Sequence, residues 1–190
     1  MYAVIGEHQS DVDTLANIIK RLCGNDRVSI KGKGFNGSGE LLKRGASQLQ
    51  LFKDLQCKKF IACYDSDGFN PDDRRNELIK DVFRPSGISP EHCVAVIPVN
   101  MIESWILADL DAISKVIKFW PLGKVVVNPE GVRFPKKHLE DLSEKNHRPR
   151  YNHATMNAAI AKHLNLDVVR RRCPSFETLC KFVVDGAGNL

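Results

Sequence analysis

The sequence predicts an α/β fold: a mostly parallel sheet with helices on both faces and a small C-terminal helical extension. Two observations carry this prediction. In the first hundred residues, short apolar segments alternate with segments of helical periodicity, and the apolar segments are continuous rather than alternately apolar and polar. Such strands, separated by helices, indicate a parallel sheet buried on both faces. We expect a core over residues 1–120 and a mainly helical extension over residues 121–190, packed on that core.

The first elements are a strand, a helix and a short second strand. Tyr2–Gly6 is apolar and β-prone. A helix is expected over Asp11–Cys23, with Ser10 as its cap and Asp13 at the capping-box position. Val28–Ile30 then reads as a strand.

The next segment, Lys31–Gly39, is rich in glycine and is expected to be a loop. It has neither the spacing of a phosphate-binding P-loop nor that of a dinucleotide-binding turn. Beyond it we expect a helix over Glu40–Leu55, a strand over Phe60–Tyr64, a helix over Asp72–Phe83 and a strand over Cys93–Val99.

Beyond residue 100 the pattern becomes mainly helical. Met101–Ile117 carries apolar residues at helical spacing, which predicts a helix facing the core. Lys124–Val127 is a candidate short strand, and Gly186–Leu190 is expected to fray. Further helices are expected over residues 136–145, 153–165 and 175–184.

The composition is that of a soluble globular domain of 190 residues, with 43% hydrophobic and 27% charged side chains. The six cysteines show no zinc-binding spacing, and neither a signal peptide nor a membrane-spanning stretch is visible. We therefore expect reduced thiols, a cytoplasmic location and no membrane partner. The net charge of +5 comes mostly from residues 101–190, which favours a polyanionic partner.

The chemistry-bearing motif is Asp65-Ser66-Asp67-Gly68, directly after an apolar strand. In a strand, residues i and i+2 point to the same face, so Asp65 and Asp67 are expected to converge. Two carboxylates held close together favour a hard divalent cation such as Mg²⁺. The alternative is an acidic turn that caps the next helix.

Other candidate residues are expected at the same edge, because the carboxyl ends of parallel strands form the ligand edge of such a sheet. Glu7 follows the first strand, and Glu103 follows the fourth as a further ligand or general base. Asp11 is a further acidic candidate. Lys33 is a candidate to stabilise an oxyanion, and the alternative is that its glycine-rich loop is only a flexible connector. Each of the carboxylates has a second explanation, as a first-turn charge at a helix N-terminus.

Three basic clusters lie downstream and suit a track for a phosphate backbone, although such clusters are also typical of solvated faces. They are Lys136-Lys137, His147-Arg148-Pro149-Arg150 and Arg170-Arg171-Arg172.

A glutamate at the end of the first strand, followed by Asp-x-Asp-Gly after a later parallel strand, resembles the Toprim domain, a Rossmann-like fold of topoisomerases, primases and overcoming-lysogenization-defect nucleases. The matching residues are Glu7, Asp65 and Asp67, with Asp11 four residues after the first glutamate, as in the nuclease branch. His8 departs from the glycine usual there. Three further stretches resemble a family of small Toprim-like bacterial proteins: Ile97-Pro98 with Ile102–Asp109, Pro135-Lys136, and Arg172–Phe176.

The resemblance implies a Mg²⁺- or Mn²⁺-dependent nuclease, with DNA favoured over RNA as substrate. It also implies an ABC-type ATPase partner and a role in phage defence. In this interpretation Glu7, Asp65 and Asp67 hold one or two ions, Asp11 and Glu103 complete a second site, and Lys33 neutralises transition-state charge.

Two other functions remain open. A haloacid-dehalogenase-type phosphatase would use Asp65 as nucleophile, although its motif usually sits on the first strand and here Phe69 follows Gly68. A nucleic-acid- or partner-binding subunit would keep the Toprim core without its chemistry.

Overall fold

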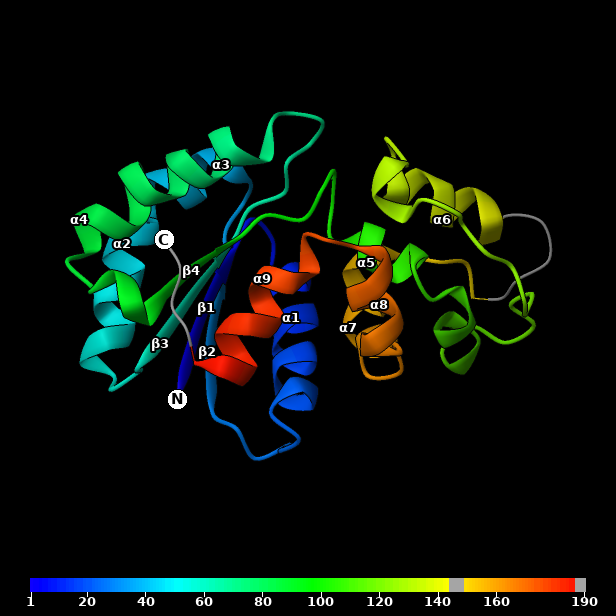
Figure 1. Cartoon of the computed structure of the whole chain (residues 1–190), viewed down its shortest axis with the longest axis horizontal. Coiled ribbons are helices and arrows are strands. Elements are labelled where there is room, and N and C mark those ends of the chain that lie inside the picture. The colour runs from blue at the N-terminus through cyan, green and yellow to red at the C-terminus, as the bar shows by residue number, and fades with distance from the viewer. Residues whose placement is uncertain (144–148, 187–190) are drawn as a thin grey trace.

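A four-stranded parallel sheet forms the centre of the protein, here a computed structural model that describes residues 1–143 and 149–186 (Figure 1). The strands are β1 (Tyr2–Gly6), β2 (Ile30–Gly34), β3 (Lys59–Cys63) and β4 (Cys93–Val96). Their order is β2-β1-β3-β4, and every pairing is parallel. The predicted α/β class is confirmed, and β1 and β3 are direct neighbours.

Helices cover both faces of the sheet (Figure 1). On one face lie α2 (Ser38–Asp54) and α3 (Pro71–Leu78), and α3 continues through a π-helical turn, η1 (Ile79–Phe83), into α4 (Arg84–Ser86). The other face is covered by α1 (Gln9–Leu22) and α9 (Phe176–Cys180).

Successive strand residues enter two separate hydrophobic cores, which explains the continuous apolar strands. In β1, Val4 packs with α1 and the C-terminal helices, whereas Ala3 and Ile5 pack with α2 and η1. In β3, Ile61 belongs to the first core and Ala62 to the second.

The C-terminal part shares the first of these cores with the sheet. For example, Asn17 of α1 donates a hydrogen bond of 2.9 Å to the carbonyl of Ala158. The remaining elements are η2 (Pro90–His92), α5 (Glu103–Leu107), η3 (Leu110–Lys115), η4 (Pro129–Gly131), α6 (Pro135–Ser143), α7 (His153–Ala161), α8 (Leu166–Arg172) and η5 (Lys181–Asp185). Of these C-terminal elements, α9 packs on β4 and α7 packs on α1, so they extend the helical layer on this face.

The glycine-rich loop prediction is wrong for its first half, and so are the bounds of the second strand. β2 covers Ile30–Gly34 rather than Val28–Ile30. A Cβ atom at Gly34 would lie 2.2 Å from the backbone nitrogen of Gln9. Glycine is used in this strand because the start of α1 packs directly against it, which overrides the low strand propensity of glycine.

The single helix predicted over Met101–Ile117 is also wrong. α5 ends at Leu107, and Asp109 has φ −138° and ψ 77°, outside the helical region. Its carboxylate accepts a hydrogen bond of 2.6 Å from the backbone amide of Asn165. A distant segment thus interrupts the helix, while η3 keeps the apolar residues on the core side.

Smaller predictions also fail. Lys124–Val127 is not a strand, and Val127 is 92% exposed. α1 is capped at His8, whose backbone amide donates to Asp11 at 3.0 Å, so Asp11 takes the role predicted for Asp13. The helix predicted over 153–165 ends at Ala161, and α8 follows without having been predicted. Most of the predicted frayed tail lies outside the described residues.

Candidate metal centre

The carboxylates predicted from the sequence gather at the carboxyl edge of the sheet. Glu7 directly follows β1, and Asp65 lies two residues beyond β3. Asp11 lies in the first turn of α1, and Glu103 begins α5 after β4. Glu7, Asp11 and Glu103 are all buried.

Backbone amides hold Glu7 and Asp65 in place. The amide of Asp65 donates a hydrogen bond of 3.1 Å to Oε1 of Glu7. Oδ1 of Asp65 in turn accepts one of 3.1 Å from the amide of Ile102, just before α5. These two bonds connect the segments that follow β1, β3 and β4.

Asp67 does not lie on a strand beside Asp65, as the alternation of side chains along a strand predicted. β3 ends at Cys63, so Asp65 and Asp67 lie in the loop beyond it, and Asp67 adopts a left-handed φ of 48°. Its amide donates a hydrogen bond of 2.9 Å to the carbonyl of Asn100, and its side chain is exposed. Asp67 is nevertheless close enough to raise the pKa values of Glu7 and Asp65.

The group carries an excess of negative charge. Burial raises the pKa of Asp65 well above its usual range, and the charges of Asp11, Glu103, Glu7 and Asp67 raise it further. Burial also raises the pKa of Glu7 to about 7, against a hydrogen bond from Asp65 that lowers it. Carboxylates that raise one another's pKa values in this way form the kind of field that a divalent cation relieves.

The carboxylates do not form an assembled coordination shell. Within residues 1–143 and 149–186, no three His, Cys, Asp or Glu side chains are placed to hold one ion together. The donor type still fits Mg²⁺ or Mn²⁺, because these ions prefer oxygen ligands. Mg²⁺ also commonly binds through one or two carboxylates, with waters and substrate phosphates as its other ligands.

Glu103 is held by side chains that the sequence did not indicate. It is 4% exposed, and Nδ2 of Asn157 donates a hydrogen bond of 3.0 Å to its Oε1. The hydroxyl of Tyr151 donates one of 2.6 Å to Oδ1 of Asn157. Burial raises the pKa of Glu103, and the bond from Asn157 opposes that shift. Glu103 is therefore fixed in position by α7.

Lys33 is not brought to the carboxylates. It is exposed on the edge strand β2, 5.9 Å from the ring centroid of Phe35, and the charge it influences is that of Glu40. Lys136, at the start of α6, is instead the lysine whose charge lowers the pKa values of Asp11 and Glu103. The structure therefore places Lys33 on the exposed edge of the sheet, and its predicted role stays a prediction.

Lys136 and Arg74 are two cations whose charges act on the carboxylates. Nζ of Lys136 lies 2.9 Å from Nε2 of His153. Arg74, on α3, lowers the pKa of Glu7 and bonds to the hydroxyl of Tyr64. The order of strands and helices along the sequence could not predict that Lys136 and Arg74 act on this site. Their positions relative to Glu7 and Asp11 depend on tertiary packing.

Two arginines of the predicted phosphate track have internal partners. Arg170 makes two hydrogen bonds to Glu177, of 2.5 and 2.7 Å, and Arg172 donates to the carbonyls of Ala108 and Val126. His147 and Arg148 lie outside the described residues. Arg170 and Arg172 thus have a structural role, whereas Arg171 between them is exposed.

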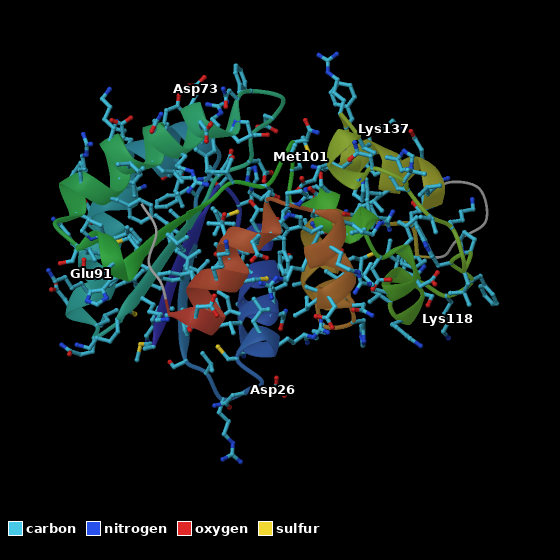
Figure 2. All side chains as sticks on the ribbon, in the orientation of Figure 1. Asp26, Asp73, Glu91, Met101, Lys118 and Lys137 are labelled. Carbon is cyan, nitrogen blue, oxygen red and sulfur yellow. The ribbon has the colours of Figure 1, made fainter. Side chains whose placement is uncertain are left out.

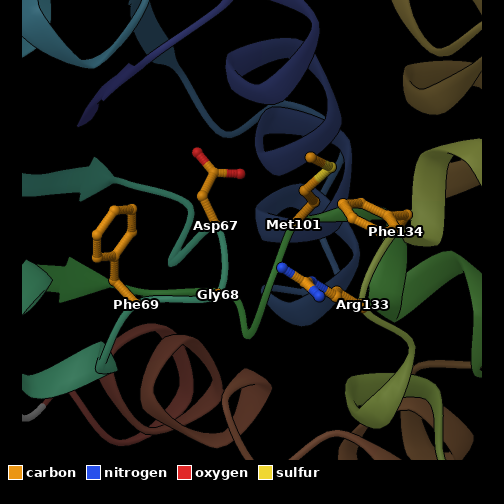
Figure 3. A pocket seen from close by; sticks show the side chains of 6 residues that line it. All are labelled: Asp67, Gly68, Phe69, Met101, Arg133 and Phe134. Carbon is orange, nitrogen blue, oxygen red and sulfur yellow. The ribbon is translucent and has the colours of Figure 1, made fainter.

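A cleft of about 500 Å³ opens beside Asp67 (Figure 3). Its lining combines charged, aromatic and flexible apolar side chains: Asp67, Gly68, Phe69, Met101, Arg133 and Phe134. The carboxylate group is therefore bordered by a concave surface able to hold part of a ligand.

Together, the fold and the site define an α/β protein with a parallel sheet and an acidic group at its carboxyl edge. By its sequence, the chain belongs to the family described as Domain of unknown function (DUF4276), whose profile matches residues 5–183. No curated protein and no solved structure matches the chain. Among the described residues, no helix has both the length and the apolar character that a bilayer crossing requires.

Proposed function

We propose that this protein is a divalent-metal-dependent nuclease that hydrolyses phosphodiester bonds in nucleic acid. The observation that carries the proposal is the mutual influence of Asp65 and four other carboxylates, at the ligand edge of a parallel sheet. Oxygen donors in that number favour Mg²⁺ or Mn²⁺, and the Toprim-like motif pattern supports the same chemistry.

In this proposal Glu7, Asp65 and Asp67 hold one or two ions, and Asp11 and Glu103 contribute to a second position. Such an ion polarises a scissile phosphate and lowers the pKa of an attacking water. Lys136, rather than Lys33, neutralises charge that develops on the phosphate, because Lys136 faces the carboxylates.

Each side chain then has a physical task. The amides of Asp65 and Ile102 orient Glu7 and Asp65, so these two carboxylates need little reorganisation. Asn157 fixes Glu103 at the buried side of the group. Arg74 balances part of the charge of Glu7 and Asp67.

The resemblance further supports a DNA substrate, an ABC-type ATPase partner and a role in phage defence. A second candidate is a non-catalytic subunit that binds nucleic acid or a partner protein. It is favoured by the lack, among the described residues, of three side chains arranged around one ion.

The test is cleavage of labelled DNA and RNA by the purified protein, with and without an ABC-type ATPase encoded beside it. The reactions contain Mg²⁺, Mn²⁺ or a chelator. We expect metal-dependent cleavage that Asp65→Asn reduces by at least about 100-fold, since even outer partners of a metal site cost 10- to 100-fold. The control is Asp73→Asn, which changes an exposed first-turn aspartate of α3 (Figure 2). Absence of cleavage in every combination, with nucleic-acid binding retained, would favour the binding subunit.

A further inference from the structure

Two exposed phenylalanine rings flank the cleft beside Asp67. Phe69 is 62% exposed and Phe134 is 59% exposed. Figure 3 shows them on opposite sides of the cleft, with Asp67, Met101 and Arg133 between them. The cleft volume of about 500 Å³ lies within the range of small-ligand sites.

The ring of Phe69 is held in place from one side. The guanidinium carbon of Arg74 lies 4.2 Å from the ring centroid of Phe69 and 4.6 Å from that of Tyr64. Arg74 therefore contacts an exposed ring and a buried one, and Tyr64 is 1% exposed. Nε of Arg74 is buried and has no hydrogen-bond partner among the described residues. The arrangement presents Phe69 as a fixed aromatic surface with a cation beside it.

Phe134 repeats this pairing on the other side. The guanidinium carbon of Arg133 lies 5.2 Å from its ring centroid. Arg133 makes no hydrogen bond or ion pair with any residue in the ranges 1–143 and 149–186. Its positive charge is therefore available to an anionic ligand, beside an aromatic face.

We infer that the cleft binds an unpaired nucleotide, with its base stacked on Phe69 or Phe134 and its phosphate at Arg133. Aromatic rings accept any base, and guanidinium groups match phosphate geometry. A base inside a duplex has both faces covered by its neighbours and must leave the stack to use such a surface.

This inference rests on the proposed nuclease function and names its substrate class. Asp67 belongs both to the cleft lining and to the carboxylate group, so a base in the cleft places its adjoining phosphodiester at the metal centre. The substrate is then a single strand, a flap or a loop, unpaired at the position of cleavage.

The experiment measures binding and base stacking separately from cleavage. Native protein is titrated, with Ca²⁺ in place of Mg²⁺, into oligonucleotides that carry the fluorescent base 2-aminopurine. The strands are DNA or RNA of one sequence, single-stranded or as a blunt duplex, and gels check that they stay intact. Anisotropy reports affinity, and quenching of 2-aminopurine reports stacking.

For DNA or for RNA, we expect the single strand to bind at least about tenfold more tightly than the duplex of the same sequence. Binding of that single strand should quench the emission of 2-aminopurine. At least one of Phe69→Ala and Phe134→Ala should weaken binding on the order of tenfold to a hundredfold and restore emission, while substitution of the same residue by Trp should keep both signals. The matched control is Phe119→Ala, since Phe119 is 84% exposed and does not line the cleft. Comparison of the DNA and RNA strands shows which of the two nucleic acids the cleft binds.

The outcomes separate the two claims. If cleavage occurs but duplex and single strand bind equally, or Phe69→Ala and Phe134→Ala change nothing, the inference is overturned and the nuclease proposal stands. If the cleft binds and quenches a single strand that the protein never cuts, the inference holds and the nuclease proposal fails. If no nucleic acid binds at all, both are overturned.

Discussion

The backbone amide of Asp65 donates a hydrogen bond of 3.1 Å to Glu7, which joins the segments following two neighbouring strands. Asp65 also receives a hydrogen bond from Ile102. Each carboxylate is therefore held by the backbone of another segment. Because backbone groups move little, the two side chains are pre-positioned before any ligand arrives.

The first prediction concerns pH and stability. The pKa of Glu7 in the folded protein is about 7, above its ordinary value of 4.5. Because the pKa of Glu7 is higher in the folded protein than in the unfolded chain, protonation of Glu7 favours the folded state. This contribution to stability is fully present below pH 4.5 and is lost as the pH rises through 7. In a chelator, we expect Glu7 to lower the free energy of unfolding by about 3 kcal/mol across this window.

Urea denaturation of the native protein and Glu7→Gln at several pH values measures this effect. The difference between the two stability curves should grow from about pH 4.5 to pH 7 and then level off. Curves that stay parallel over the whole range would contradict the assigned burial of Glu7.

The second prediction separates Lys136 from Lys33. Lys136 faces Asp11 and Glu103, whereas Lys33 lies on the outer strand near Phe35. We expect Lys136→Met to reduce metal-dependent cleavage by about 100- to 1,000-fold and Lys33→Met to leave kcat nearly unchanged. Single-turnover cleavage rates measure both. Equal effects of the two substitutions would contradict the assignment of Lys136.

The third prediction concerns the contact that holds Glu103. Asn157 is fully buried and bonds to both Glu103 and Tyr151. Asn157→Ala leaves two buried polar groups without this partner, and we expect a loss of about 1–3 kcal/mol in the free energy of unfolding. Asn152→Ala is the control, since Asn152 is exposed at the start of the same helix. Similar denaturation midpoints for the two variants would refute the structural role of Asn157.

The fourth prediction compares two glycines of the glycine-rich stretch Lys31–Gly39. A Cβ at Gly34 would meet the backbone of Gln9 at 2.2 Å, whereas a Cβ at Gly39 meets nothing within 4 Å. We expect Gly34→Ala to destabilise the protein by about 3 kcal/mol or more. Gly39→Ala, inside α2, should stabilise it by about 0.5 kcal/mol. Thermal unfolding checks both, and a tolerated Gly34→Ala would contradict the close approach of α1 to β2.

The sequence could predict the strands that bury both faces, because their apolar character depends on burial alone. It could also predict that Glu7, Asp65 and Glu103 share an edge, since strand direction decides which ends meet. It could not predict β2, where glycine is required by contact with Gln9 rather than by strand propensity.

Features that depend on contacts distant in the sequence were not predictable. The interruption at Asp109 comes from Asn165, and the support of Glu103 comes from Asn157. Lys136 acts on Asp11 and Glu103 because α6 packs against α5, the helix that begins at Glu103. Each of these contacts joins segments more than thirty residues apart, so no local pattern encodes it.

Binding of Mn²⁺ is the direct test of whether Glu7 and Asp65 hold a divalent ion. Electron paramagnetic resonance of free Mn²⁺ can be followed while protein is added, for the native chain, Glu7→Gln, Asp65→Asn and the exposed control Asp73→Asn. We expect the native protein and Asp73→Asn to remove one or two Mn²⁺ ions per chain from solution, and Glu7→Gln and Asp65→Asn to bind Mn²⁺ far more weakly. Equal Mn²⁺ binding by all four proteins, or none by the native protein, would contradict this expectation.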